Sequence, residues 1–416
     1  MTRGGGRGWD LLDVERHLLR LLHDRAARRR HLEVHAHLLR HHLVNSNLLF
    51  SALVSSSSSV SYSLRLFLHH PSPSLILFNS TLKSLSLSSS VFNEMPRNDI
   101  VAWNLMINGF CKRRDFGSGY RYFRQMGERS IVSWNSMLAG LSRCGQDGEV
   151  LQLFEEMVES GGIEVDDATL ATVLPVCARM GNLELGRWVH RYADRVGLLK
   201  SAVNVGNAII DMYCKCGDLV SARSVFNAIA RKSVVTWNTM IMGLAFNGHG
   251  HDGLSLFEDM KRSSQQPNAG TFVGILGCCT HAGLADKGRE LFHSMHSEHG
   301  IEPRLDHYGC MVDLLGRCGL VKEAHRLVRS MPMRPSAAIW GALLSACRSH
   351  SELGLAEVAI KELIELEPWN SGNYVLLANL YANAGRWEEA EKTRCLMKEK
   401  SVQKVPGQSL LELGVV

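Results

Sequence analysis

Several kinds of sequence feature are missing from this chain of 416 residues. It has no run of eighteen apolar residues, which argues against a membrane-spanning helix. Its eleven cysteines contain no C-x-x-C pair, although structural zinc sites commonly use two such pairs. The P-loop of nucleotide-binding enzymes and the G-x-S-x-G turn of many hydrolases are also absent. These absences argue against a membrane-spanning protein, a common zinc-binding protein, a P-loop nucleotide-binding enzyme and a hydrolase with the G-x-S-x-G turn.

A strong excess of one charge is lacking as well. The formal net charge is +5, which is too small to indicate nucleic-acid binding unless the basic residues are concentrated on one surface. Apolar residues make up 45% of the chain and are sufficient for a large core. Most cysteines recur at helix positions, so we interpret them as reduced core residues.

The chain repeats itself. A Trp followed by Asn or Gly begins four similar segments, at Trp103, Trp134, Trp237 and Trp340, with separations of 31, 103 and 103 residues. Homologous positions subdivide the longer interval into steps of 31 to 36 residues. A fixed period in this range is typical of solenoid proteins.

Each repeat reads as two helices. Apolar residues at helical spacing begin each repeat, as in Trp103, Met106 and Ile107, and a glycine such as Gly145 at the fifteenth position predicts the end of the first helix. A second apolar helix follows. Because neither helix can bury its apolar face alone, we predict an all-α fold, an α-solenoid with a right-handed superhelix of helix-turn-helix repeats.

The N-terminal region has a different composition. The first 43 residues contain nine arginines, no lysine and seven histidines. This composition resembles an organelle transit peptide, and it predicts localisation to the mitochondrion or, alternatively, the chloroplast. Five acidic residues in the same stretch favour the other interpretation, a degenerate first repeat.

From residue 100 onward the repeats resemble those of the plant pentatricopeptide-repeat (PPR) family, PLS subclass. The alternation of lengths and the segments 207–217 and 307–319 carry the resemblance, and residues 337–416 resemble the E motifs that follow such arrays. Many relatives continue into a DYW deaminase domain, whereas this sequence ends at Val416.

The resemblance implies a division of the chain. Residues 1–46 form the transit segment or degenerate repeat, 47–99 degenerate or truncated repeats, 100–336 the array and 337–416 the E motifs. The array comprises seven repeats: 100–130, 131–166, 167–202, 203–233, 234–268, 269–304 and 305–336.

The resemblance also implies that single-stranded RNA is read one base per repeat, by the fifth and last residues of each motif. These pairs are Asn104 with Ser130, Asn135 with Asp166, Asn207 with Ser233, and Asn238 with Asn268. By analogy, Asn with Asp favours uracil, Asn with Ser cytosine, and Asn with Asn either pyrimidine. The pairs Ala171 with Ala202, Val273 with Arg304 and Gly309 with Ser336 should read weakly or not at all. The alternative role for the asparagines is helix capping.

Two further positions recur. The thirteenth residue is basic in five repeats, at Lys112, Arg143, Arg179, Lys215 and Arg317. These residues predict a phosphate-binding stripe, and a solvated face is the alternative. The second residue is Val101, Val132 or Val235, which could pack on base faces or, alternatively, between repeats.

We expect no enzymatic activity, no cofactor and no metal. A nucleobase deaminase needs H-x-E followed by P-C-x-x-C, and neither His296-Ser-Glu298 nor His350-Ser-Glu352 is followed by such a pair. The resemblance implies site recognition for organellar C-to-U RNA editing, with a deaminase or other editing protein docked on residues 337–416. The alternatives are RNA binding for splicing, stability or translation, and a tetratricopeptide-like (TPR-like) protein scaffold.

Overall fold

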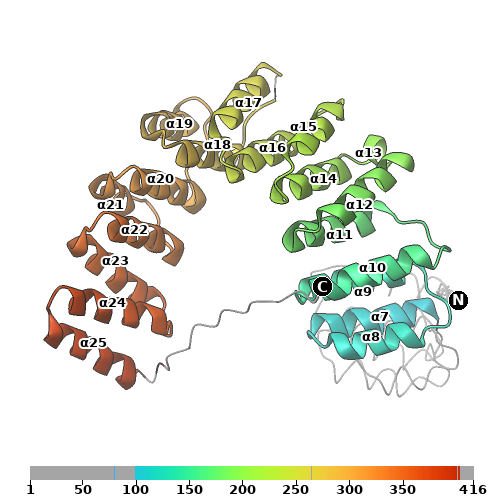
Figure 1. The fold of residues 1–416 in the computed structure, drawn as a ribbon, viewed down its shortest axis with the longest axis horizontal. Coiled ribbons are helices and arrows are strands. Elements are labelled where there is room, and N and C mark those ends of the chain that lie inside the picture. Colours follow the sequence, from blue (N-terminus) through green and yellow to red (C-terminus); the bar gives the residue numbers. More distant parts are fainter. Residues whose placement is uncertain (1–78, 80–98, 264, 401, 403–416) are drawn as a thin grey trace, which may run out of the picture. The chain divides into compact units, whose positions relative to one another are not determined.

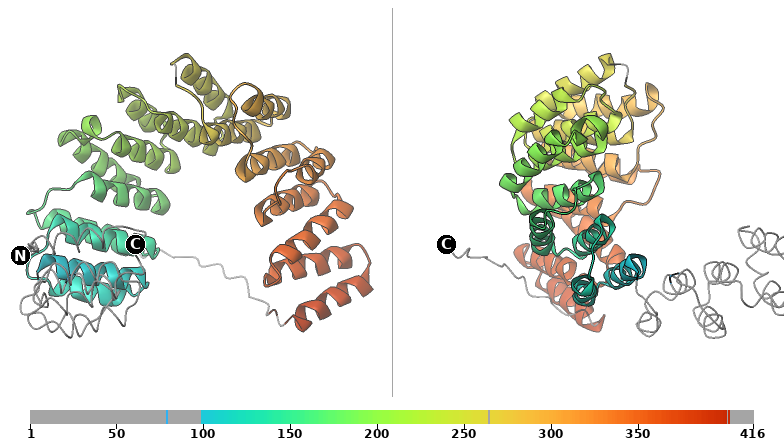
Figure 2. Two further views of the ribbon diagram at one scale, coloured as in Figure 1. Left: turned by 180° about the vertical axis from the view of Figure 1, so that it is seen from behind. Right: turned by 90° about the vertical axis from the view of Figure 1, so that its right-hand side faces the viewer.

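The computed structural model describes residues 79, 99–263, 265–400 and 402. All regular structure in these residues is helical, and Figures 1 and 2 show stacked helices without a strand among them. The predicted all-α solenoid of helix pairs is thereby confirmed. The transit segment and the truncated repeats lie outside the described residues, apart from Asn79 and Asp99.

The chain divides into two compact units, Met1–Met180 and Gly181–Val416. Among the described residues of the first unit, two helix pairs precede a single helix. These helices are α7 (Ile100–Lys112), α8 (Phe116–Gln125), α9 (Ile131–Arg143), α10 (Asp147–Glu159) and α11 (Asp167–Met180).

The second unit continues the same alternation and adds one short helix, α13. Its helices are α12 (Leu183–Arg195), α13 (Leu198–Ser201), α14 (Val203–Lys215), α15 (Leu219–Ala228), α16 (Val234–Phe246), α17 (Gly250–Arg262), α18 (Ala269–Ala282), α19 (Ala285–Ser297), α20 (Leu305–Arg317), α21 (Val321–Arg329), α22 (Ala337–Ser349), α23 (Leu353–Leu366), α24 (Ser371–Asn383) and α25 (Trp387–Glu399).

First helices adjoin one another directly within each unit. In the second unit, α14 packs on α16, α16 on α18, α18 on α20 and α20 on α22. A second helix such as α17 packs against its own first helix, α16, and the first helix of the next repeat, α18. The first helices from α14 to α22 therefore form a continuous row, in which equivalent positions of successive repeats become neighbours.

The recurring tryptophan joins one repeat to the next. The ring of Trp237 on α16 meets the ring of Phe226 on the preceding second helix edge-on, with centroids 5.1 Å apart. Trp134 and Phe123 repeat this contact at 4.9 Å in the first unit. Such aromatic pairs contribute roughly 0.5–1.5 kcal/mol beyond the area they bury. The Trp-Asn signature thus marks where a repeat docks on its predecessor.

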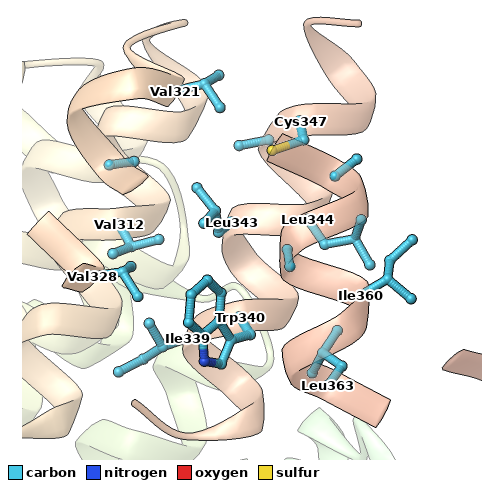
Figure 3. Packing of buried hydrophobic residues seen from close by; sticks show 14 of the residues in the cluster. Val312, Val321, Val328, Ile339, Trp340, Leu343, Leu344, Cys347, Ile360 and Leu363 are labelled. Atoms are coloured by element: carbon cyan, nitrogen blue, oxygen red, sulfur yellow. The ribbon is translucent and has the colours of Figure 1, made fainter. Parts of the chain in front are cut away.

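The core of the second unit continues into its C-terminal helices. Figure 3 shows Trp340 and Leu343 of α22 packed among valines of the preceding pair and aliphatic residues of α23. Leu343 is fully buried, and burying a side chain of this kind contributes roughly 1.5–3 kcal/mol. None of the described helices is long and apolar enough to cross a membrane.

The predicted stop glycines adopt the left-handed conformation. All seven have φ between 64° and 80°, and they are Gly145, Gly181, Gly217, Gly248, Gly283, Gly319 and Gly385. Arg114 and Ser351 occupy the same position in their motifs and adopt φ of 62° and 57°. The turn therefore keeps its geometry in the two motifs that lack glycine, although a side chain disfavours this conformation.

Candidate nucleic-acid interface

The fifth and last residues of each repeat are placed by the start of a first helix. The first helices begin at residues 100, 131, 167, 203, 234, 269, 305 and 337, which coincide with the repeat boundaries set by the sequence. The fifth residue therefore lies in the second turn of its helix. The last residue stands immediately before the first helix of the next repeat.

Four of the last residues in the array cap the first helix that follows them. Side-chain oxygens of Ser130, Asp166, Ser233 and Asn268 accept the backbone N–H of the residue three positions further on, at 2.8 to 3.4 Å. Capping of this kind stabilises a helix by roughly 1 kcal/mol. The fifth-residue asparagines lie inside helices and cap none. The alternative role for the asparagines was therefore wrong, and capping belongs to their partners.

In two repeats the fifth and last residues bind each other. The side-chain amide of Asn135 donates to both carboxylate oxygens of Asp166, at 3.0 and 3.2 Å. The amide of Asn238 donates to Oδ1 of Asn268 at 3.0 Å. The sequence separations are 31 and 30 residues, so stacking of adjacent repeats creates both contacts.

The Asp166 carboxylate is held in its ionised form. Burial raises the pKa of this carboxyl group, but hydrogen bonds from Thr169 and Asn135 outweigh burial and leave the pKa below its ordinary value of 3.8. An ionised carboxylate only accepts hydrogen bonds. The Asn135–Asp166 pair therefore presents a fixed acceptor beside an amide.

The two pairs with serine differ. No hydrogen bond joins Asn104 to Ser130 or Asn207 to Ser233 in the described part of the chain. The Oδ1 atoms of Asn104 and Asn207 are buried and have no hydrogen-bond partner. A buried amide oxygen without a partner costs free energy unless a ligand supplies a donor.

The structure adds a pair that the sequence prediction missed. The amide of Asn79 donates to the carboxylate of Asp99, at 3.2 and 3.4 Å, just as Asn135 does to Asp166. Asp99 also caps α7 by accepting the N–H of Ala102 at 2.8 Å. The sequence contains a signal for this pair, because Phe78-Asn79 resembles the recurring Trp-Asn. The signal was missed because Asn79 precedes Asn104 by only 25 residues, which is shorter than the repeat length of 31 to 36 residues.

The basic residues at position thirteen are all exposed, but they differ in their partners. Three of them form ion pairs: Arg179 with Asp147 at 2.6 Å, Lys215 with Asp211 at 2.8 Å, and Arg317 with Asp313 at 3.1 Å. For Lys112 and Arg143, the described residues contain no carboxylate within ion-pair distance. These two are the cations most available to an external anion.

The position-two valines lie on the surface. Val101, Val132 and Val235 are 54%, 57% and 58% exposed. The alternative of packing between repeats was therefore wrong. Each valine stands three residues before a fifth-position asparagine, so both share one face of the helix.

All eleven cysteines are free, and six of them are buried. In the part of the chain that the structure describes, no group of three His, Cys, Asp or Glu side chains could hold a metal ion. His296 of the H-x-E sequence forms a surface pair with Glu302 at 2.9 Å.

Comparison with known sequences points to one family. Profiles described as PPR repeat match residues 101–131, 132–162, 207–234, 270–299 and 306–335. A profile described as PPR repeat family matches 232–281, and one described as E motif matches 350–412.

Three relatives from Arabidopsis thaliana illustrate the similarity. The chain is 42% identical to pentatricopeptide repeat-containing protein At1g09190 over 480 residues, covering 96% of the chain and 99% of the relative. It is 41% identical to the chloroplastic protein At1g08070 and 44% identical to At5g56310, covering 82% and 83% of the chain. It spans 42% and 65% of those two relatives, less than two thirds of each.

Solved structures share the fold. The maize pentatricopeptide repeat protein PPR10 has a TM-score of 0.58 at 17% identity, covering 94% of this chain and 60% of PPR10. The same protein in complex with an 18-nt psaJ RNA element has a TM-score of 0.62 at 18% identity, covering 90% and 58%. At such low identity the likeness concerns the fold alone.

Proposed function

Since this chain belongs to the pentatricopeptide-repeat family, we propose that it binds single-stranded RNA and reads it one base per repeat. The observation that carries the proposal is the Asn135–Asp166 contact and its recurrence at Asn238–Asn268. A side chain in the second turn of one first helix meets there the residue that caps the next first helix, beside an exposed valine. A maize protein of the same fold has been solved in complex with an 18-nt RNA element.

Each amide pair gives a base edge donors and acceptors to match. Asn135 with Asp166 is proposed to select uracil. Asn104 with Ser130 and Asn207 with Ser233 are proposed to select cytosine, and Asn238 with Asn268 to accept either pyrimidine. The buried Oδ1 atoms of Asn104 and Asn207 support this role, because a base can supply the hydrogen bond that they lack.

The valines and the free cations complete the proposed interface. Val101, Val132 and Val235 offer apolar surface for base faces, which exclude water when they pack. Lys112 and Arg143 are proposed to hold phosphates directly. Arg179, Lys215 and Arg317 would first have to exchange their carboxylates for a phosphate, so they contribute less to RNA affinity.

The process served is proposed to be C-to-U editing of organellar transcripts. The match to the E motif supports this choice, because residues 337–416 then offer a docking region for a deaminase supplied by another protein. We propose the mitochondrion as the organelle concerned, with the chloroplast as the alternative. Loss of specific edits in a knockout plant supports editing, whereas correctly edited transcripts with splicing or stability defects favour the other RNA-binding functions. If the protein does not bind RNA, the remaining function is that of a TPR-like protein scaffold.

Base reading is tested at the repeat 131–166. Asn135→Thr keeps a small polar group but changes the hydrogen-bonding edge, and by family analogy it shifts preference from uracil towards guanine. Binding to RNA with uracil at that position is expected to weaken about tenfold, as for a mismatch worth roughly 1–3 kcal/mol, while the guanine-substituted RNA gains. Dissociation constants are measured at one salt concentration.

Lys112→Ala is the matched control for that experiment. It is expected to weaken all RNAs alike and to reduce the slope of affinity against salt by about one. An unchanged uracil-to-guanine ratio in Asn135→Thr would refute base reading by this residue.

A further inference from the structure

A hydroxyl from the next repeat touches the fifth-residue asparagine in two of the repeats. The single hydroxyl proton of Thr169 is shared between Oδ1 of Asn135 at 2.6 Å and Oδ1 of Asp166 at 2.8 Å. Oγ1 of Thr271 donates to Oδ1 of Asn238 at 2.7 Å. Both threonines are the third residue of the following repeat and are fully buried.

These contacts fix which way each amide points. The ionised Asp166 carboxylate only accepts, so the amide group of Asn135 that faces it must be the NH₂ group. The oxygen of Asn135 then faces Thr169, which supplies the donor that it needs. The hydrogen-bond partners therefore determine which end of the Asn135 amide is oxygen and which is nitrogen. The orientation of Asn and Gln amides is generally assigned in this way.

The same reasoning applies to the second site. Oδ1 of Asn268 accepts the backbone N–H of Thr271 at 3.1 Å, so this atom is an oxygen and the group of Asn238 that faces it is NH₂. Asn238 is thereby oriented as Asn135 is.

The repeats with serine lack this constraint. There the third residue of the next repeat closes a capping box. The hydroxyls of Ser133 and Thr236 lie 3.1 Å from the hydroxyls of Ser130 and Ser233 and accept their backbone N–H. Thr271 closes the same kind of capping box with Asn268 and still donates to Asn238, whereas among the described residues the hydroxyls of Ser133 and Thr236 make no hydrogen bond to Asn104 or Asn207. The Oδ1 atoms of Asn104 and Asn207 are left without a partner.

We infer that Thr169 and Thr271 are positioning residues for base selection, an inference that rests on the proposed function. Each holds its asparagine so that one N–H and one lone pair face an incoming base in a fixed order. Uracil offers N3–H and the O4 acceptor, whereas cytosine offers the N3 acceptor and an N4 donor, so the two bases present opposite orders. A third residue thus sets selectivity from outside the repeat whose base is read.

The experiment compares RNAs that carry uracil or cytosine opposite the repeat 131–166, at fixed salt. Thr169→Val replaces the hydroxyl by a methyl group of similar size. It is expected to reduce the preference for uracil, measured as the dissociation constant for the cytosine RNA divided by that for the uracil RNA, roughly fivefold, the effect of one neutral hydrogen bond. Thr169→Ser retains the hydroxyl and is expected to keep the wild-type ratio.

Thr236→Val is the control at the homologous position. Its hydroxyl serves the capping box and does not touch Asn207, so the base ratio opposite the repeat 203–233 should stay unchanged. If Thr169→Val disturbs folding, as judged by circular dichroism, Thr169→Ala removes the same hydroxyl without burying an extra methyl group and is measured instead.

The outcomes separate the two levels of the proposal. A wild-type protein that shows no uracil-to-cytosine preference at this position contradicts base reading itself. A wild-type preference that persists in both hydroxyl-free variants overturns the positioning role alone. A reduced preference that Thr169→Ser restores supports it, because a merely structural role for the side chain would weaken both RNAs equally.

Discussion

Arg114 and Ser351 illustrate how one residue can carry local strain. Each adopts a left-handed conformation that seven homologous positions fill with glycine. This conformation costs a residue with a side chain roughly 1–2 kcal/mol. A glycine at this position avoids that cost. It also destabilises the folded state by roughly 0.4–1 kcal/mol, because it increases the conformational entropy of the unfolded chain.

We therefore predict that Arg114→Gly and Ser351→Gly each stabilise the protein by about 0.5–1 kcal/mol. The measurement is the midpoint of urea denaturation. The reverse substitution, Gly145→Ala, should lower the midpoint by a similar amount. Destabilisation by both glycine variants would show that the side chains of Arg114 and Ser351 make contacts that outweigh the strain.

Buried thiols make the stability of the protein depend on pH in the alkaline range. Burial raises the pKa of Cys214 and Cys278 to about 12, and that of Cys111 to about 11, from an ordinary value of 9.0. The folded state therefore keeps protons that the unfolded state releases. The resulting stability is fully present below pH 9 and is lost as pH rises through 9 towards 11–12.

We predict that the urea midpoint falls between pH 8 and pH 10, with a contribution of up to roughly 1.4 kcal/mol from each such thiol. Cys214→Ala should flatten this decline. Cys395→Ser at an exposed position should leave it unchanged. A midpoint that does not vary over this range would contradict the assignment.

At the scale of helices, much could be predicted from the sequence. Repeat boundaries followed from the spacing of Trp-Asn and coincide with the observed helix starts. Helix ends followed from glycine at the fifteenth position. Both are local signals, set by capping and by backbone conformation. Contacts between repeats, such as that of Thr169 with Asn135, depend on the distance and rotation between helices, which no local pattern specifies.

The close packing of one first helix against the next is another contact between repeats that no local pattern specifies. A Cβ on Gly243 of α16 would lie 2.2 Å from Sγ of Cys214 on α14. Gly140 on α9 has the same relation to Cys111 on α7, also at 2.2 Å. In both cases the glycine follows the cysteine by 29 residues. Sulfur thus fills the space that the missing side chain leaves open.

We predict that Gly243→Ala destabilises the protein by roughly 1–3 kcal/mol, because overpacking forces the two helices apart. Gly341 is the control, since it also lies inside a first helix but a Cβ there meets nothing within 4 Å. Gly341→Ala should stabilise by roughly 0.5–1 kcal/mol. Equal effects of the two substitutions, measured by urea denaturation, would rule out tight packing at Gly243.

For the whole chain, the pairs define an order of bases. The family resemblance implies that repeats run parallel to the RNA, so the array from residue 100 corresponds to 5′-C-U-x-C-Y-x-3′. Gly309 offers no side-chain edge for a further base. The proposed edited cytidine lies a few nucleotides to the 3′ side. This order of bases could be predicted from the sequence because it depends only on the order of the repeats and on the identity of their fifth and last residues.

Asn79 and Asp99 add one base to the 5′ end of the predicted RNA sequence. They make the same amide–carboxylate contact as Asn135 and Asp166, at 3.2 Å compared with 3.0 Å for the shorter distance of each pair. If the contact rather than the length of the repeat determines reading, the preferred RNA is 5′-U-C-U-x-C-Y-x-3′. The incomplete repeat then reads uracil despite its missing residues.

The prediction is that replacing the first uracil of this RNA by adenine weakens binding about tenfold, as for other mismatches. Asn79→Ala should weaken binding to the original RNA and abolish the difference between the two RNAs, because the amide that distinguishes them is gone. Substitution of the third base, opposite Asn135, serves as the internal reference. If that substitution weakens binding while the first-base substitution does not, then a complete repeat is required for reading, and the Asn79–Asp99 contact serves only to cap α7.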